Sequence, residues 1–188
     1  MSAPVIRRAA LISGKTLQFR DASVADAEFI LALRTDADKS RHLSTVSGRL
    51  EDQRDWLRGY ANGSGQAYFI IEDAQGKPLG TVRLYDAQDD SFCWGSWILA
   101  DAAPAPAAIE SALIVYAYAI DVLGFRAAHF QVNRGNERVR AFHERFGAVC
   151  VAEDDLECRY TLSADAIAAS RKRYARYLPS SLAVEALA

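Results

Sequence analysis

The stretch between residues 68 and 99 constrains the fold most strongly. Three runs of apolar and β-branched residues, 68–72, 79–85 and 92–99, are separated there by short polar segments rich in Asp and Gly. Connections this short join strands that lie side by side and run in opposite directions. The pattern therefore predicts an antiparallel meander of three strands.

Beyond residue 106 the pattern changes, because long helical segments alternate with single strands. Apolar residues recur at helical spacing from Ile109 to Leu123, and Gly124 follows where a helix end is expected. A buried strand at 128–132 and a second helix at 136–146 come next. Neighbouring strands that are joined through a helix run parallel, so the pattern predicts a mixed sheet.

The other expected elements fit one domain without repeats or linkers. They are a strand at 16–20, helices at about 23–33 and 50–60, strands near 149–151 and 160–162, and a last helix at 164–178. We predict a single domain over residues 1–188, with loose termini at about 1–14 and 179–188. Its fold class is α/β (α+β), with a mixed, mostly antiparallel central sheet flanked by helices.

Composition excludes several classes of partner. The formal net charge is −2 and charges of both signs are interspersed, so neither nucleic acid nor a membrane surface is expected as a partner. No apolar run approaches the length of a signal core or a membrane span. Cys93, Cys150 and Cys158 show no Cys-x-x-Cys spacing, which predicts reduced thiols, a cytoplasmic location and no metal site.

Two segments resemble motifs of the GCN5-related N-acetyltransferase (GNAT) superfamily. Residues 133–148 (Asn-Arg-Gly-Asn-Glu-Arg-Val-Arg-Ala-Phe-His-Glu-Arg-Phe-Gly-Ala) are similar to its Asn-x-x-Ala-x-x-(Leu/Phe)-Tyr-x-x-x-Gly-Phe block. Residues 94–99 (Trp-Gly-Ser-Trp-Ile-Leu) lead into a loop and a long helix, as in the family. The segments 33–36 and 53–57 resemble the branch of ribosomal-protein and nucleotide-amino-sugar acetyltransferases.

The resemblance implies an acetyl-CoA-dependent enzyme. In the family, the strand matching 94–99 splays from its neighbour and its backbone binds the acetyl-pantetheine arm. The following helix N-terminus binds the CoA pyrophosphate, because its first amides lack partners and the helix dipole is positive there. The donor-binding residues implied are Ile98, Leu99, Ala107, Ala108, Ile109, Asn136 and Phe142.

The loop before the long helix departs from the family pattern. It reads Ala-Pro-Ala-Pro-Ala-Ala over 103–108, where the family has Gln/Arg-x-x-Gly-x-Gly/Ala. Each proline removes an N–H group that could bind phosphate, although proline suits the start of a helix. Glu110 would repel a pyrophosphate. A stiff connector that binds no ligand is the alternative interpretation of this loop.

One residue of the second block could supply acid catalysis. His143 occupies the position of the family's tyrosine, which gives a proton to the departing thiolate, and a histidine that titrates near neutral pH could do the same. The alternative is that His143 only packs on its helix. Asn136 could equally serve as the N-cap of that helix. The general base is open among His42, Glu72, Tyr85 and Asp86, with a water chain as a further alternative.

Aromatic and basic residues mark the expected acceptor cleft, namely Trp56, Arg83, Tyr85 and Trp94. Trp94 and Trp97 cannot both face the cleft in a regular strand, because their separation is odd. Arg34, Arg41 and Arg83 are candidate phosphate-binding cations. The predicted acceptor is a primary amine on a small molecule such as a nucleotide-linked amino sugar.

Two other functions compete with this prediction. One is acetylation of a protein N-terminus or a ribosomal protein, which would need an open groove for a peptide. The other is a non-catalytic GNAT-fold domain that binds a ligand or a partner, which the proline-rich loop favours. The fold also leaves a sheet edge and a helix pair that are compatible with a homodimer.

Overall fold

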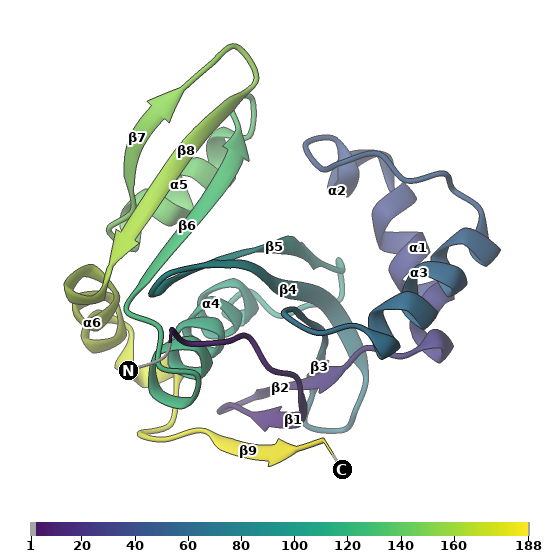
Figure 1. Cartoon of the computed structure of the whole chain (residues 1–188), viewed down its shortest axis with the longest axis horizontal. Coiled ribbons are helices and arrows are strands. Elements are labelled where there is room, and N and C mark those ends of the chain that lie inside the picture. The colour runs from purple at the N-terminus through teal and green to yellow at the C-terminus, as the bar shows by residue number, and fades with distance from the viewer. Residues whose placement is uncertain (1–2, 188) are drawn as a thin grey trace.

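A nine-stranded sheet in the order β7-β8-β6-β5-β4-β3-β2-β1-β9 organises the chain, and the computed structural model describes residues 3–187 of it (Figure 1). The strands are β1 (Ala9–Ser13), β2 (Leu17–Asp21), β3 (Ala67–Asp73), β4 (Pro78–Gln88), β5 (Ser91–Leu99), β6 (Ala127–Asn133), β7 (Val149–Glu153), β8 (Glu157–Ser163) and β9 (Ala183–Ala186). The helices are α1 (Ala27–Thr35), α2 (Ala37–Ser40), α3 (Leu50–Asn62), α4 (Ala107–Ala117), α5 (Glu137–Arg145) and α6 (Ala164–Arg173).

Within residues 3–187, every strand pair is antiparallel except β5 with β6. The predicted meander is formed by β3, β4 and β5, and the predicted helical crossover is α4 between β5 and β6. The structure thus confirms the mixed, mostly antiparallel sheet. None of the helices in this part of the chain has the length and apolar character that crossing a membrane requires.

The parallel pair β5–β6 is short, and this opens the sheet. Residues 91–93 of β5 pair with 127–129 of β6, and no pairing between the two strands continues past Cys93 among the described residues. Beyond that point β6, β7 and β8 turn away from β5 (Figure 1). The result is a V-shaped gap between the two halves of the sheet.

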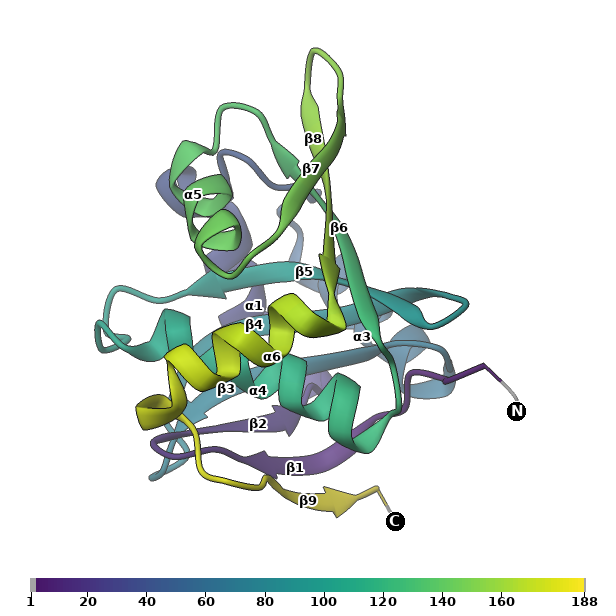
Figure 2. The same cartoon turned by 90° about the vertical axis from the view of Figure 1, so that its left-hand side faces the viewer.

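Helices cover both faces of the larger half of the sheet. α4 and α6 lie on one face, as Figure 2 shows, where α4 packs on alternate strand residues such as Phe19, Phe69 and Val82. α1 and α3 cover the other face through a smaller core that includes Ile30, Leu57 and Ile70. Alternation along the strands sends successive side chains to opposite faces, which is why one sheet supports two cores.

The two termini differ from the sequence prediction. Residues 9–13 and 183–186 were expected to be loose, but they form β1 and β9, which pair with each other at the edge of the sheet. Their short sequences lack a strong strand pattern, so pairing partners elsewhere in the chain decide their conformation. The last helix ends at Arg173 and not near residue 178, and a 3₁₀ turn at Ala175–Tyr177 follows it.

Candidate active site

A β-bulge in β5 lies just where this strand leaves β6. Thr81 of β4 pairs with Ile98 and Arg83 with Gly95, so β5 carries one residue more than β4 between the two pairs. Ser96 in this bulge has a φ of 46°, which is rare for a residue other than glycine. The Thr81 hydroxyl donates to the Ser96 carbonyl over 2.8 Å and holds the bulge in place.

The bulge turns both tryptophans of β5 to the same face of the sheet. The rings of Trp94 and Trp97 lie 5.3 Å apart, and both indole N–H groups donate to α4. Trp94 donates to the Tyr116 hydroxyl over 3.2 Å, and Trp97 donates to the Ser111 hydroxyl over 3.1 Å. The expectation from a regular strand was wrong because of the extra residue. Trp94 is a core residue, 3% exposed.

His143 lies among aromatic rings between β5 and β6. Its ring centroid is 4.2 Å from that of Phe130 on β6 and 5.2 Å from that of Trp94 on β5. The residue is 5% exposed, and its Nδ1 has no hydrogen-bond partner among residues 3–187. Burial lowers the pKa of His143 to about 3, so the imidazole is neutral at physiological pH. This environment is unfavourable for the predicted proton donor.

A cavity of about 200 Å³ opens on the opposite face of β5, the face covered by α1 and α3. Its lining residues are Arg34, Ser44, Val46, Gln53, Trp56, Tyr68, Arg83 and Ser96. The structure thus brings together two of the predicted acceptor residues, Trp56 and Arg83. Tyr85 lies next to the cavity, with its hydroxyl close to Gly95, whereas Trp94 lies on the other face.

Arg34 is fixed in this cavity without a counter-ion. Its Nη2 donates to the backbone and side-chain oxygens of Ser44 over 2.8 and 2.9 Å. Its Nε is buried and has no hydrogen-bond partner in the described residues. A buried donor without an acceptor is costly, so a ligand that supplied an oxygen here would be favoured.

Arg83 is the second cation of the cavity. Its guanidinium lies between two aromatic rings, 5.2 Å from the Trp56 centroid and 4.7 Å from the Tyr85 centroid. Its Nε donates to Gln66 over 2.8 Å, and burial lowers the pKa of Arg83 from its usual value. No carboxylate of residues 3–187 forms an ion pair with either cavity arginine. The cavity therefore favours an anion.

Arg41, the third predicted phosphate-binding cation, lies outside this cavity. Its side chain is 66% exposed and pairs with Asp38 on the same short segment over 3.1 Å. Conversely, the sequence did not single out Ser44, Val46, Tyr68 or Ser96 as pocket residues. Ser96 could not be found from the sequence, because only the bulge brings its hydroxyl to this face.

The side of the V formed by β5 and the start of α4 offers unpaired backbone groups of the kind that acetyl-CoA needs. Because β6 pairs with β5 only as far as Cys93, the β6-facing backbone of the rest of β5, including Ile98 and Leu99, has no strand partner. The amides of Ala108 and Ile109 at the start of α4 have no backbone acceptor within residues 3–187. The Ala107 amide instead donates to Pro104 over 2.9 Å. Two free amides at a helix N-terminus suit a pyrophosphate.

From the sequence, Glu110 was expected to repel an anion at this helix end, but its contacts show otherwise. Its carboxylate turns away from the helix end and accepts hydrogen bonds from the backbone amides of Lys15, Thr16 and Leu17 over 2.7–2.9 Å. The side chain is 2% exposed. Its charge is therefore compensated by the amides of the β1–β2 turn, so Glu110 is not directed at the N-terminus of α4.

The two residues at α5 that the resemblance predicts to contact acetyl-CoA, Asn136 and Phe142, have structural partners of their own. The Asn136 side chain accepts from the Val139 amide over 3.3 Å, which confirms the N-cap interpretation. The Phe142 ring packs 5.0 Å from Trp97 and 4.8 Å from Phe146. Phe142 therefore contacts β5 through Trp97, whereas Asn136 serves the start of α5.

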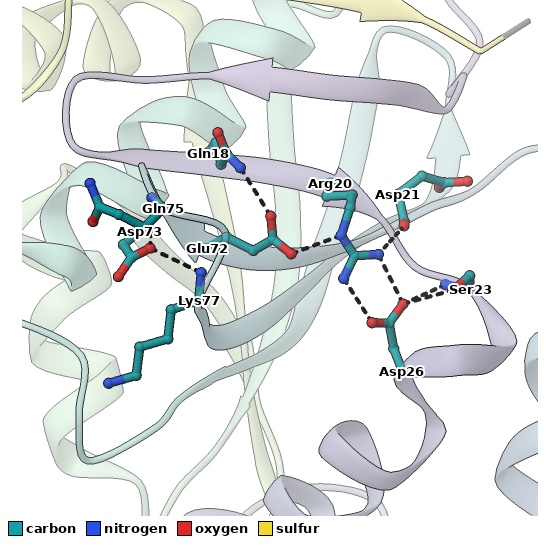
Figure 3. A network of polar contacts seen from close by, with 9 residues as sticks. All are labelled: Gln18, Arg20, Asp21, Ser23, Asp26, Glu72, Asp73, Gln75 and Lys77. Atoms are coloured by element: carbon teal, nitrogen blue, oxygen red, sulfur yellow. Dashed lines mark hydrogen bonds and ion pairs between the residues drawn. The ribbon is translucent and has the colours of Figure 1, made fainter.

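Glu72 is excluded as a general base by its contacts. Figure 3 shows its carboxylate between Gln18 and Arg20, with the Arg20 Nε 2.7 Å away. Arg20 in turn holds Asp26, and the hydrogen bond with Asp26 is the main cause that raises the pKa of Arg20. Glu72 lies on β3, which β4 separates from β5, so this network stabilises the sheet and the start of α1.

Two other base candidates lie nearer to the V. Asp86 lies 3.4 Å from the Nε2 of His129, whose Nδ1 is 2.7 Å from the Ser91 hydroxyl. His129 pairs with Cys93 at the last rung before the strands separate. The sequence prediction missed His129; the available signal was a lone histidine within a buried strand. His42 reaches the loop before α5, where a side chain at Gly135 would come within 3.2 Å of its ring.

Comparisons with known proteins agree with this geometry. Residues 16–149 match the model of the acetyltransferase (GNAT) domain family. The structure is similar to apo FdhC, a nucleotide-linked sugar GNAT, with 38% identity, a TM-score of 0.80, and coverage of 89% of this chain and 97% of that one. No curated protein matches the sequence.

Two more distant structures share the fold. A GCN5-related N-acetyltransferase from Brucella melitensis has 18% identity and a TM-score of 0.77, with 95% of this chain and 90% of that one covered. Spermidine N-acetyltransferase from Vibrio cholerae, in complex with CoA and spermine, has 15% identity and a TM-score of 0.71, with 81% and 98% covered. The chain belongs to the GNAT family of acetyltransferases. It is an N-acetyltransferase, and acetyl-CoA is its cosubstrate.

Proposed function

We propose that the acceptor is a small molecule that carries a primary amine and an anionic group, with a nucleotide-linked amino sugar as the best candidate. The observation that carries this proposal is the pair of cavity arginines, Arg34 and Arg83, neither of which has a carboxylate partner among residues 3–187. A diphosphate offers the oxygens that two guanidinium groups bind well. The similarity to a nucleotide-linked sugar GNAT supports the same class of acceptor.

The cavity argues against the other acceptors. A polyamine such as the spermine bound by the Vibrio protein is a polycation, and two arginines would repel it. A peptide needs an open groove, whereas Ser44 and Val46 from the segment between α2 and α3 wall the cavity on one side. Trp56 presents an aromatic face at the rim, where a sugar or base ring could stack.

The proposed division of labour follows from the two faces of β5. Acetyl-CoA supplies a thioester acetyl group that an amine can attack. The backbone of Ile98 and Leu99 and the amides of Ala108 and Ile109 would hold this donor in the V, while Phe142 shapes its wall. Arg34 and Arg83 would orient the acceptor from the other face, with Trp56 against its ring. His129, at the apex of the V, is the best-placed residue to receive the amine proton.

Steady-state acetylation of three acceptors tests the proposal: a nucleotide-linked amino sugar, the same amino sugar without the nucleotide, and spermidine. We expect the first to have the highest kcat/KM. Arg34→Gln and Arg83→Gln should each lower that value about 10- to 100-fold, because a charge-assisted hydrogen bond contributes about 1.5–3 kcal/mol. Acetyl-CoA affinity, measured by calorimetry, should not change.

Arg41→Gln is the matched control, since Arg41 is an exposed arginine outside the cavity. It should leave all three kcat/KM values unchanged. A preference for spermidine, or an equal loss in Arg41→Gln, would overturn the proposed acceptor. Absence of acetyl-CoA binding by the folded protein would instead favour a ligand-binding domain without activity.

A cytoplasmic location belongs to the same proposal. Cys93, Cys150 and Cys158 are all unpaired, as thiols in a reducing compartment are. A homodimer stays a prediction, with β7 and β9 as the edges of the sheet that such an assembly could use. Both points are open to direct measurement by fractionation and by light scattering.

A further inference from the structure

The β7–β8 hairpin carries two of the three cysteines and takes no part in the site described above. It extends the sheet beyond β6 and projects from the body of the protein (Figure 1). Cys150 lies on β7 and is exposed, whereas Cys158 lies on β8 and is fully buried against β6. The sequence spacing of these cysteines predicted no metal site, so their spatial arrangement is the decisive observation.

A second β-bulge brings ligand-type side chains to one face of this hairpin. Cys150 pairs with Tyr160 and Glu153 pairs with Cys158, so β7 carries one more residue than β8 between these pairs. In a regular strand Cys150 and Glu153 would point to opposite faces, since they are an odd number of residues apart. The extra residue cancels this, and both side chains join Cys158 on the same face.

The three donor atoms are already close together. The Sγ atoms of Cys150 and Cys158 and a carboxylate oxygen of Glu153 all lie within 4.8 Å of one another. The Cys158 Sγ is 3.7 Å from the Glu153 Oε2. Ligands of a tetrahedral zinc ion with Zn–S bonds of about 2.3 Å stand about 3.8 Å apart. Small side-chain movements would therefore complete the geometry.

We propose that the hairpin binds one thiophilic divalent cation of the zinc class through Cys150, Glu153 and Cys158. Two thiolates and a carboxylate form a donor set that binds Zn²⁺ in preference to Mg²⁺ or Ca²⁺. The fourth position would be open to solvent, because Cys150 and Glu153 are both exposed. Both thiols lose their protons to solvent when the metal binds.

The site would act on the stability of the hairpin. Its ligands come from both strands, so an ion would join the edge strand β7 to β8. β8 in turn contacts α5, where the Tyr160 hydroxyl donates to Glu144 over 2.8 Å and accepts from Arg140. Arg140 also places a positive charge close to Cys158. Two thiolates and one carboxylate carry three negative charges, so the ligand set stays negative even with Zn²⁺ bound. Metal binding would therefore rigidify the outer half of the V.

Titration of the reduced, metal-free full chain with Zn²⁺ alone tests this site. Native mass spectrometry should show one ion per chain, and Co²⁺ as a substitute should give thiolate-to-metal absorption. Zn²⁺ should raise the melting temperature, and a chelator should reverse the rise. Cys150→Ser and Glu153→Gln should each weaken binding at least about tenfold, since loss of even an outer-shell partner costs about that much.

Both variants change exposed side chains, so folding should survive, whereas Cys158 is buried and is left unchanged. Asp155→Asn, in the exposed turn of the same hairpin, is the matched control and should bind Zn²⁺ as the wild type does. No binding by the reduced protein would overturn the site, as would binding that Cys150→Ser leaves unchanged. A disulfide between Cys150 and Cys158 in the protein isolated without reductant would also overturn it, in favour of a redox pair.

Discussion

The two faces of β5 at its bulge carry opposite chemistry. On the face toward α4 and α5, Trp94, Trp97 and His143 form a cluster of aromatic rings packed against one another. On the face toward α1 and α3, Arg34 and Arg83 lie in a cavity that no carboxylate of the described residues lines. One strand thus serves as a core element on one side and as the floor of a polar pocket on the other.

The difference teaches that residue type alone does not assign a side chain to a site. Trp94 and His143 were predicted as acceptor-binding and catalytic residues, and both lie on the apolar face. Trp56 and Arg83 have the same kinds of side chain as many core or surface residues, yet they line the cavity. The face on which a side chain of β5 lies decides what it contacts, and the bulge decides the faces of Ser96 and Trp97.

The largest expected difference between the faces is in stability. Trp94→Ala should lower the free energy of unfolding by about 3–5 kcal/mol, because it empties a buried site against α4. Trp56→Ala should cost only about 1 kcal/mol, since Trp56 is 39% exposed and mainly stacks on Tyr60 and meets Tyr68 edge-on. Urea unfolding measures both. Equal costs for the two variants would contradict the assignment of the faces.

Although the loss of Trp56 should cost little stability, it should have a clear effect on activity. Trp56→Ala should raise KM for the acceptor and leave acetyl-CoA affinity unchanged, because its ring borders the acceptor cavity. Trp56→Phe is the matched variant, since it keeps an aromatic face and should retain most of the affinity. An unchanged KM in Trp56→Ala would remove this residue from the acceptor site.

An intermediate effect should appear in the pH dependence of stability. His143 has its pKa lowered to about 3 by burial, whereas in the unfolded chain it titrates near its usual 6.5. The unfolded state therefore binds an extra proton between about pH 6.5 and 3. Stability falls as the pH drops through this window, by up to about 1.4 kcal/mol per pH unit.

His143→Phe should remove this contribution and flatten the acid limb of the stability curve relative to wild type. Urea unfolding from pH 8 to pH 4 measures the difference, and the values near pH 8 provide the reference, because His143 is neutral there in both states. If His143 instead donates a proton in catalysis, His143→Phe should abolish a pKa in the profile of kcat. An unchanged acid limb would mean that the imidazole is hydrated and not buried.

The smallest expected effect concerns the bulge residue itself. Ser96→Gly should change stability by no more than about 0.5 kcal/mol, because relief of the positive φ offsets the greater flexibility of the unfolded chain. Ser96→Val should cost about 1–2 kcal/mol, since a β-branched residue resists this conformation. Thermal unfolding compares the two variants, and equal stabilities would show that the bulge does not impose this backbone on Ser96.

Local patterns determined much of the fold. Apolar, β-branched runs and short turns predicted β3, β4 and β5, helical spacing predicted α3 and α4, and the linking helix predicted the parallel pair. Asn136 was placed correctly as an N-cap because capping depends on the next three residues alone. The termini failed, because β1 and β9 are strands through pairing with distant residues.

The sequence by itself determined the meander, the crossover, the family and three residues that line the cavity, Arg34, Trp56 and Arg83. Only the tertiary structure decided that Trp94 and Trp97 share the α4 face, that Glu110 serves the β1–β2 turn, and that Cys150, Glu153 and Cys158 meet. For the tryptophans and for the hairpin residues, the physical reason is that one extra residue reverses the side-chain alternation of a strand. Such a bulge depends on the pairing partner, which no local pattern records.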